Sequence, residues 1–166
     1  MQIRNEIVPD WPGVDAVLRS AFPSDAEALL VARLRNTANP LISLVAEDGD
    51  EIIGHILFTP ITLPGANILL MGLAPLAVLP ERQHQGIGSA LVSAGLHQCK
   101  LLKTSAVFVL GHASYYPRFG FQSTAPFGIH SEYEVRAENF MMVLLDSGQN
   151  MLPRGVVRYH PEFNRM

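Results

Sequence analysis

The segment Val78–Val92 contains the clearest candidate for a binding site. After an apolar stretch and a turn, the residues that follow Gly86 and Gly88 have the spacing of an amphipathic helix. The first amides of a helix have no partners inside it and carry partial positive charge, and glycines let a ligand approach them closely. This pattern predicts a site for a phosphate, to which Arg82 and His84 would add positive charge. An ordinary strand-to-helix turn built on glycines is the alternative.

Two common phosphate-binding motifs do not fit this segment. No Lys-Ser or Lys-Thr pair follows the glycines, as a Walker A loop requires. Leu91 stands where the third glycine of a Gly-x-Gly-x-x-Gly motif would be. A P-loop nucleotidase and a Rossmann dinucleotide-binding domain are therefore disfavoured.

A second motif lies one predicted helix and one predicted strand further along the chain. Tyr116-Pro-Arg-Phe-Gly-Phe121 resembles the Tyr-x-x-x-Gly-Phe element of the GNAT N-acyltransferase superfamily. Gln83-x-x-Gly86-x-Gly88 resembles the Arg/Gln-x-x-Gly-x-Gly/Ala acetyl-CoA motif of the same family, and the two motifs occur in the family's order and separation. Together with the Leu-Ala-Pro-Leu-Ala-Val and Val-Leu-Gly-His runs, they are most similar to its YhbS-like branch.

The resemblance implies that acetyl-CoA is the co-substrate. Main-chain groups of Leu76 and Val78 would pair with the pantetheine arm as with an added strand. The pyrophosphate would be bound by the amides of successive residues, namely Gln83, His84, Gln85, Gly86, Ile87, Gly88 and Ser89. In the family this strand and the next splay apart to admit the cofactor. Pro75, which lacks a main-chain donor, fits such a splay, and an edge strand is the alternative.

The implied activity is transfer of an acetyl group to a primary amine, on a small molecule or a peptide, by direct attack in a ternary complex. Tyr116 would lie near the thioester sulfur and protonate the departing thiolate, which is feasible because thiol and phenol pKa values are ~8.5 and ~10. Tyr115 is the candidate for anchoring the loop. A non-catalytic domain that senses acyl-CoA is the alternative from a different class.

The proton acceptor for the amine is not identified by the motifs. Many family members have a glutamate on the strand that reads Leu73–Val78 here, and this chain has no acid there. The candidates that remain are water and four side chains, Glu81, His112, Glu132 and Glu134. For each of them, a role in a solvated or ordered loop is the alternative.

The rest of the chain predicts the elements that position these motifs. Helical spacing predicts helices over Val14–Phe22 and Ala26–Leu34, the second opened by a Ser24–Glu27 capping box, and a third helix after Gly86. Apolar runs bounded by turn residues predict six strands: Ile3–Val8, Leu41–Glu47, Glu51–Thr59, Ile68–Val78, Thr104–Gly111 and Phe140–Leu145. The tail Leu152–Met166 is expected to be mostly irregular.

This order predicts an α/β fold with a mixed, mostly antiparallel sheet and flanking helices. The strands Ile68–Val78 and Thr104–Gly111 flank the third helix in a right-handed crossover, so we expect them to be parallel. From the resemblance, they are the splayed central pair. At 166 residues the chain is expected to form one domain, residues 1–166.

Composition narrows the class of protein. With 48% hydrophobic and 16% charged residues, the chain is not of the disordered type. The net charge of −3 without a basic block predicts no nucleic-acid partner and disfavours an acetyltransferase of charged tRNA.

No signal peptide or membrane-length apolar run is visible, so we expect a cytoplasmic protein without membrane contact. The sole Cys99 is expected in the core, and the histidines lack ligand spacing, so no metal is predicted. A monomer and a homodimer are both open.

Overall fold

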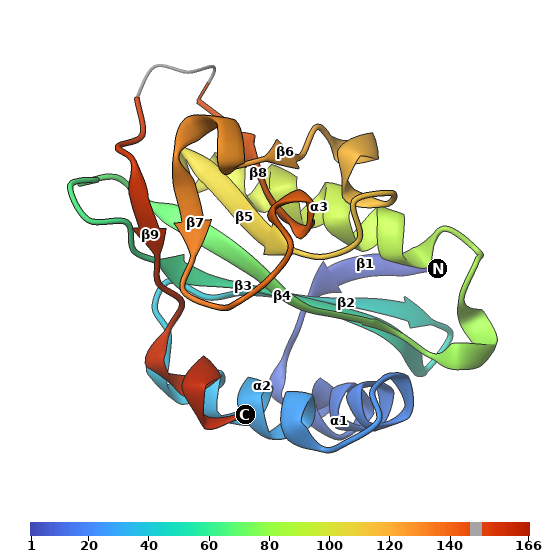
Figure 1. Ribbon diagram of the computed structural model, residues 1–166. Coiled ribbons are helices and arrows are strands. Elements are labelled where there is room, and N and C mark those ends of the chain that lie inside the picture. The colour runs from blue at the N-terminus through green and yellow to red at the C-terminus, as the bar shows by residue number, and fades with distance from the viewer. Residues whose placement is uncertain (147–150) are drawn as a thin grey trace.

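The structure, a computed structural model, describes residues 1–146 and 151–166. Its long helices are α1 (Trp11–Ala21), α2 (Ala26–Thr37) and α3 (Ile87–Leu101). Its strands are β1 (Gln2–Asn5), β2 (Ile42–Asp48), β3 (Glu51–Ile61), β4 (Leu70–Val78), β5 (Ala106–Leu110), β6 (Gln122–Ser123), β7 (Ile129–Ser131), β8 (Phe140–Leu144) and β9 (Gly155–Val157). Figure 1 shows α1 and α2 side by side below the central sheet.

The main sheet has the strand order β1-β2-β3-β4-β5-β8-β6. Its neighbours are antiparallel except β4 and β5, which are parallel because α3 forms the crossover between them. The predicted fold class, a mixed and mostly antiparallel sheet with one parallel central pair, is therefore confirmed.

The two faces of the sheet bury separate apolar clusters. One cluster joins α1 and α2 to the sheet through Val45 and Leu57, and the other joins α3 to it through Phe58. Gly95 allows the close approach of α3, since a β-carbon at this position would lie 2.1 Å from Phe58 Cε1. Cys99 is fully buried in the second cluster, as predicted, and burial raises the pKa of its thiol to about 12.

A buried polar network ties the N-terminal segment to the sheet and to α2. The Glu6 carboxylate accepts hydrogen bonds from Arg35 Nη2 at 2.5 Å and from the Ser43 hydroxyl. His55 Nε2 lies 2.8 Å from Ser43 Oγ. Because that hydroxyl donates to Glu6, the ring nitrogen is the donor, which leaves Nδ1 as the unpartnered acceptor among the described residues. Burial lowers the pKa of His55 against the opposing effect of Glu6, in keeping with a neutral ring.

The N-terminal strand is shorter than predicted. We expected Ile3–Val8, but β1 ends at Asn5. The reason is Asp10, whose carboxylate accepts a hydrogen bond from the Ile7 amide at 2.8 Å and pairs with Arg4 at 2.7 Å. These contacts hold the chain in a turn.

The predicted capping box at the start of α2 does not form. Asp25 is the N-cap residue, and the Ser24 hydroxyl accepts a hydrogen bond from the Ala26 amide at 3.2 Å. Ser24 therefore lies one residue too early to be the cap. The Glu27 side chain does not return to the Ser24 amide and lines a pocket instead.

The tail is more ordered than predicted. Residues 155–157 form β9, which pairs in parallel with β7, and Pro161–Arg165 forms a 3₁₀ helix, η6. Strands of three residues are too short to show a period in the sequence, and the pairing joins segments far apart in the chain. Figure 1 shows η6 beside α2 at the lower edge of the molecule.

Candidate functional site

The turn before α3 has the geometry of an anion-binding site. Gly86 is the N-cap residue with φ +83°, a left-handed conformation that favours glycine. In the described part of the chain, the main-chain amides from His84 to Ser89 donate no hydrogen bond, and the first to do so is that of Ala90, to the Gly86 carbonyl at 3.0 Å. These free amides lie at the positive end of a helix of 15 residues.

The first turn of α3 lies against the end of β4. A β-carbon at Gly88 would be 3.8 Å from Val78 Cγ2 and 3.9 Å from Leu76 Cδ2. The Gln83 side chain donates a hydrogen bond to the Val78 carbonyl at 3.3 Å. The predicted residues for pantetheine and for pyrophosphate are therefore neighbours in space.

The parallel strands part soon after they meet. Pairing of β4 with β5 runs from Leu70 with Ala106 to Gly72 with Phe108, although both strands continue beyond these residues. On the other side, β4 remains paired with β3. There Ala74 and Pro75 stand opposite Leu57 alone, which is a bulge. Pro75 thus lies in a central strand, so the edge-strand alternative is wrong, and a gap opens between β4 and β5 as predicted.

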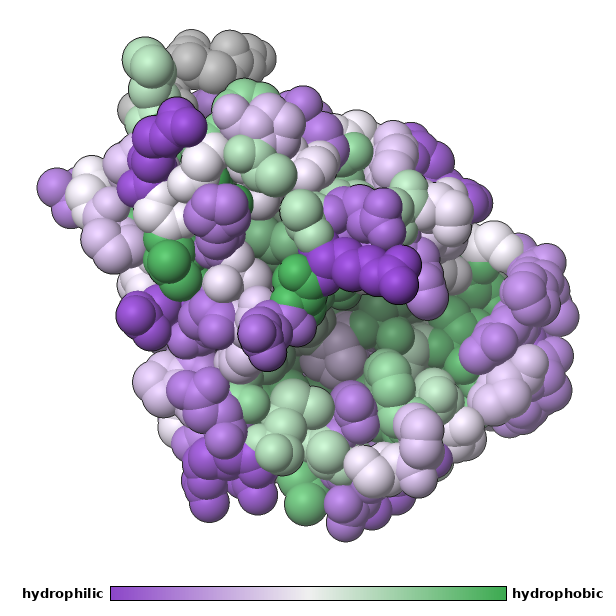
Figure 2. All heavy atoms as spheres, in the orientation of Figure 1, coloured by the Kyte–Doolittle hydropathy of each residue, from purple (hydrophilic) through white to green (hydrophobic). Residues whose placement is uncertain are grey.

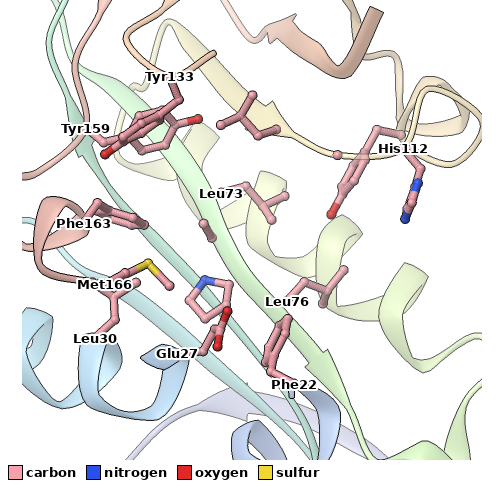
Figure 3. A pocket seen from close by; sticks show the side chains of 15 residues that line it. Phe22, Glu27, Leu30, Leu73, Leu76, His112, Tyr133, Tyr159, Phe163 and Met166 are labelled. Atoms are coloured by element: carbon pink, nitrogen blue, oxygen red, sulfur yellow. The ribbon is translucent and has the colours of Figure 1, made fainter. Parts of the chain in front are cut away.

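A pocket of about 640 Å³ opens at this gap. Residues Leu73–Leu76 of β4 line one side, and Leu110–His112 and Tyr116 line the other. The rest of its wall comes from α1, α2, the Tyr133 loop and the C-terminal segment. Figure 2 shows a recess with apolar walls above the α1–α2 layer, and Figure 3 shows the side chains that line the pocket.

Tyr116 begins a 3₁₀ helix, η3 (Tyr116–Phe119), after the loop that follows β5. The side chain is buried and its ring packs against the Phe121 ring at a centroid distance of 5.6 Å. Burial, with a smaller effect of the neighbouring Tyr115, raises the pKa of Tyr116 to about 12. The hydroxyl therefore keeps its proton at neutral pH, although the raised pKa makes it a weaker acid than a free phenol.

Tyr115 connects the same loop to α3. Its hydroxyl lies 3.2 Å from Ser89 Oγ, and its ring meets the Tyr116 ring edge to face at 5.1 Å. The Arg118 guanidinium lies 4.4 Å from the Tyr115 ring centroid, and its Nε donates to the Tyr115 carbonyl. These contacts fit the predicted role of Tyr115 as an anchor of the loop.

Of the four side chains considered as proton acceptors, only His112 lines the pocket. Glu81 is exposed and faces a different groove, beside Asp10. Glu132 accepts a hydrogen bond from the Tyr159 amide at 2.8 Å, which gives it a structural role. Glu134 is exposed outside the pocket.

Part of the pocket is not evident from the sequence. The spacing predicts a helix-cap role for Glu27 and an irregular tail for Tyr159, Phe163 and Met166, yet all four line the pocket. The aromatic residues of the tail are the one sequence signal of an apolar contact in this segment.

Two further findings concern only the residues that the structure describes. Within 1–146 and 151–166, no group of three or more His, Cys, Asp or Glu residues is arranged to hold a metal ion. Over the same residues, no helix is long and apolar enough to cross a membrane.

Comparison with known proteins identifies the class. Residues 39–123 match the family described as "Acetyltransferase (GNAT) domain", and the chain belongs to the GNAT acetyltransferase family as an N-acetyltransferase. It is 38% identical to the uncharacterized N-acetyltransferase YhbS of Escherichia coli (strain K12), over 99% of both chains.

Solved structures agree with this assignment. The crystal structure of YhbS from Escherichia coli in complex with CoA has a TM-score of 0.91 and 37% identity, covering 99% of this chain and 92% of that one. A GNAT family acetyltransferase from Brucella melitensis in complex with acetyl-CoA has a TM-score of 0.80 and 32% identity, covering 98% and 97%.

Proposed function

We propose that this protein transfers the acetyl group of acetyl-CoA to a primary amine by direct attack in a ternary complex. The pantetheine arm lies along the gap between β4 and β5 and pairs with main-chain groups of Leu76 and Val78. The pyrophosphate accepts hydrogen bonds from the amides of His84 to Ser89 at the start of α3, whereas the amide of Gln83, also predicted for this role, already donates to the Pro80 carbonyl at 3.4 Å. Support comes from the free amides and from two similar proteins, one of which binds CoA and the other acetyl-CoA.

In the reaction the acceptor amine must lose one proton, and the departing thiolate must gain one. The neutral amine attacks the thioester carbonyl carbon, a C–N bond forms, and the C–S bond breaks. The thiolate takes the Tyr116 proton and leaves as CoA thiol. The nitrogen loses its surplus proton to water or to His112, and Tyr116 regains a proton from solvent. The observation that carries this proposal is the position of Tyr116, a buried tyrosine in the wall of the pocket where β4 and β5 part.

A non-catalytic acyl-CoA sensor is the second candidate. Its support is the absence of a carboxylate on β4 between Leu73 and Val78. Against it stands the phenol in the pocket, since a domain that only binds acyl-CoA does not need an acid there.

One experiment separates the two functions. Acetyl-CoA at 100 times its Kd should stabilise the protein by about 2.7 kcal/mol, seen as a higher Tm. A panel of small amines and peptides is then screened for acetyl-CoA-dependent release of CoA thiol. Turnover with any amine, reduced in Tyr116→Phe, supports the enzyme. A Tm shift without turnover anywhere in the panel supports the sensor.

The cytoplasmic location stays a prediction, to be checked by cell fractionation.

A further inference from the structure

The half of the pocket away from Tyr116 has an aromatic wall, formed by Tyr133, Tyr159 and Phe163. The centroids of neighbouring rings lie 5.8 Å apart for Tyr133 and Tyr159, and 5.3 Å apart for Tyr159 and Phe163. Phe22, at the end of α1, lines the same pocket. Such a wall binds flat apolar groups and is attractive to a cation at the ring faces.

One carboxylate side chain lines the pocket. Glu27 is the one Asp or Glu among the lining residues, and no Lys or Arg lines the pocket. Figure 3 shows its side chain reaching from α2 between Leu30 and Phe22. The pocket is therefore suited to a ligand with one positive charge.

Glu27 also lacks a partner within the described chain, although it is half-buried. Seven other carboxylates that are not exposed each pair with a cation or accept a hydrogen bond, namely Glu6, Asp10, Asp15, Glu47, Asp48, Glu132 and Glu162. A ligand cation in the pocket would give this carboxylate the partner that it lacks within the described chain.

A second polar group, on a residue that lines the pocket, is buried and unpartnered among the described residues. The Tyr159 hydroxyl is buried and has no hydrogen-bond partner among the described residues. Its ring is fixed, because a β-carbon at Gly72 would lie 2.8 Å from Tyr159 Cε2 and the Tyr159 amide donates to Glu132. Burial raises the pKa of Tyr159, so the hydroxyl keeps its proton and is able to donate as well as accept.

From these features we infer that the acceptor is a small arylalkylamine with a polar ring substituent. Its ammonium pairs with Glu27 before it loses a proton and attacks, its ring lies against the aromatic wall, and the substituent hydrogen-bonds to the Tyr159 hydroxyl. A polyamine would leave its further charges without an Asp or Glu side chain to pair with among the residues that line this pocket. The inference rests on the proposed function for the chemistry at the amine, but the binding it describes does not require turnover.

The test uses tyramine, phenethylamine and spermidine as acceptors with acetyl-CoA. Tyramine should have the highest kcat/KM. Glu27→Gln should raise the KM for tyramine by ~10–100-fold, because a charge-assisted hydrogen bond is lost, with the KM for acetyl-CoA unchanged. Asp25→Asn, an exposed carboxylate change at the same end of α2, should change neither KM. Tyr159→Phe should remove the preference for tyramine over phenethylamine, which we expect to be ~5–10-fold.

Binding is measured separately from turnover by calorimetric titration of tyramine into the protein saturated with CoA. Tyramine binding that weakens in Glu27→Gln supports the inference even where no amine turns over, in which case the proposed function alone has failed. The inference is overturned if spermidine or a lysine peptide is the better acceptor, or if Glu27→Gln changes tyramine binding and KM by less than twofold. A Tm of Glu27→Gln close to that of the wild type confirms that the variant is folded.

Discussion

The ring of Tyr116 occupies the space that a side chain at position 111 would need, because a β-carbon on Gly111 would lie 2.2 Å from Tyr116 Cε2. Gly111→Ala should therefore displace the phenol and lower kcat, with little change in the affinity for acetyl-CoA. In a Tyr116→Phe background the same change should cost little further turnover, since the displaced hydroxyl is already absent. Steady-state kinetics of the two single variants and the double variant test this, and fully additive losses would contradict it.

The hydroxyl of Tyr116 should matter for turnover and not for binding. Tyr116→Phe keeps the ring contacts and removes the proton, so kcat should fall ~10²–10⁴-fold when chemistry limits the rate. The Tm and its shift by acetyl-CoA should stay the same. Tyr115→Phe is the matched control, and we expect it to retain most of the wild-type kcat. Equal kcat values for Tyr116→Phe and the wild type would assign the phenol a structural role.

Close approach at the start of α3 should be necessary for acetyl-CoA binding. Gly88→Val adds a branched side chain where a β-carbon would already lie 3.1 Å from the Tyr115 hydroxyl. The variant should fold but lose the Tm shift with acetyl-CoA. Ser93→Ala, an exposed position further along α3, should keep the shift. A full shift in Gly88→Val would place the pyrophosphate elsewhere.

Stability at alkaline pH should depend on Tyr116. Burial raises the pKa of Tyr116 to about 12, whereas an unfolded tyrosine loses its proton near pH 10. Between these values the unfolded chain holds fewer protons, so the free energy of unfolding falls as pH rises, by about 2–3 kcal/mol from this group. Urea unfolding from pH 9 to 12 should give a shallower decline for Tyr116→Phe than for the wild type. Parallel pH curves for Tyr116→Phe and the wild type would show that the pKa of Tyr116 is not raised in the folded protein.

The buried network around Glu6 should contribute strongly to stability. Glu6→Gln removes the carboxylate charge that pairs with Arg35 and accepts the hydrogen bond of Ser43. Breaking a buried ion pair of this kind costs ~3–5 kcal/mol. Glu138→Gln, which removes the exposed pair with Arg136, should cost only ~0–1 kcal/mol. Urea denaturation at pH 7 measures both, and similar losses in the two variants would argue against a special role for the network.

Much of the fold was predictable because its signals are local. The glycines at 86 and 88 marked the start of α3, and the apolar runs around it marked β4 and β5. Crossover handedness then made these strands parallel without any knowledge of distant contacts. Gly88 follows β4 in the chain and Tyr116 follows β5. Both residues could therefore be assigned to the region where these two strands part.

The acceptor half of the pocket was not predictable in the same way. The spacing of Ser24 and Glu27 fits a capping box, and only the tertiary position of α2 reveals that the Glu27 carboxylate lines a pocket. Tyr159 and Phe163 reach the pocket because β9 pairs with β7, a contact between short segments far apart in the chain. Such contacts leave no periodic pattern in one sequence.

The brief pairing of β4 with β5 divides the sheet into two leaves. One leaf contains β1 to β4 and carries α2 with Glu27, and the other contains β5, β8 and β6 and leads into Tyr116. Three residue pairs form the seam between them. In the proposed complex the pantetheine arm of the co-substrate lies along the open part of that seam and acts as a removable strand. Glu27, which is proposed to bind the acceptor amine, and Tyr116, the proposed acid, are thus held on separate leaves. Their alignment depends on the co-substrate that joins the two leaves.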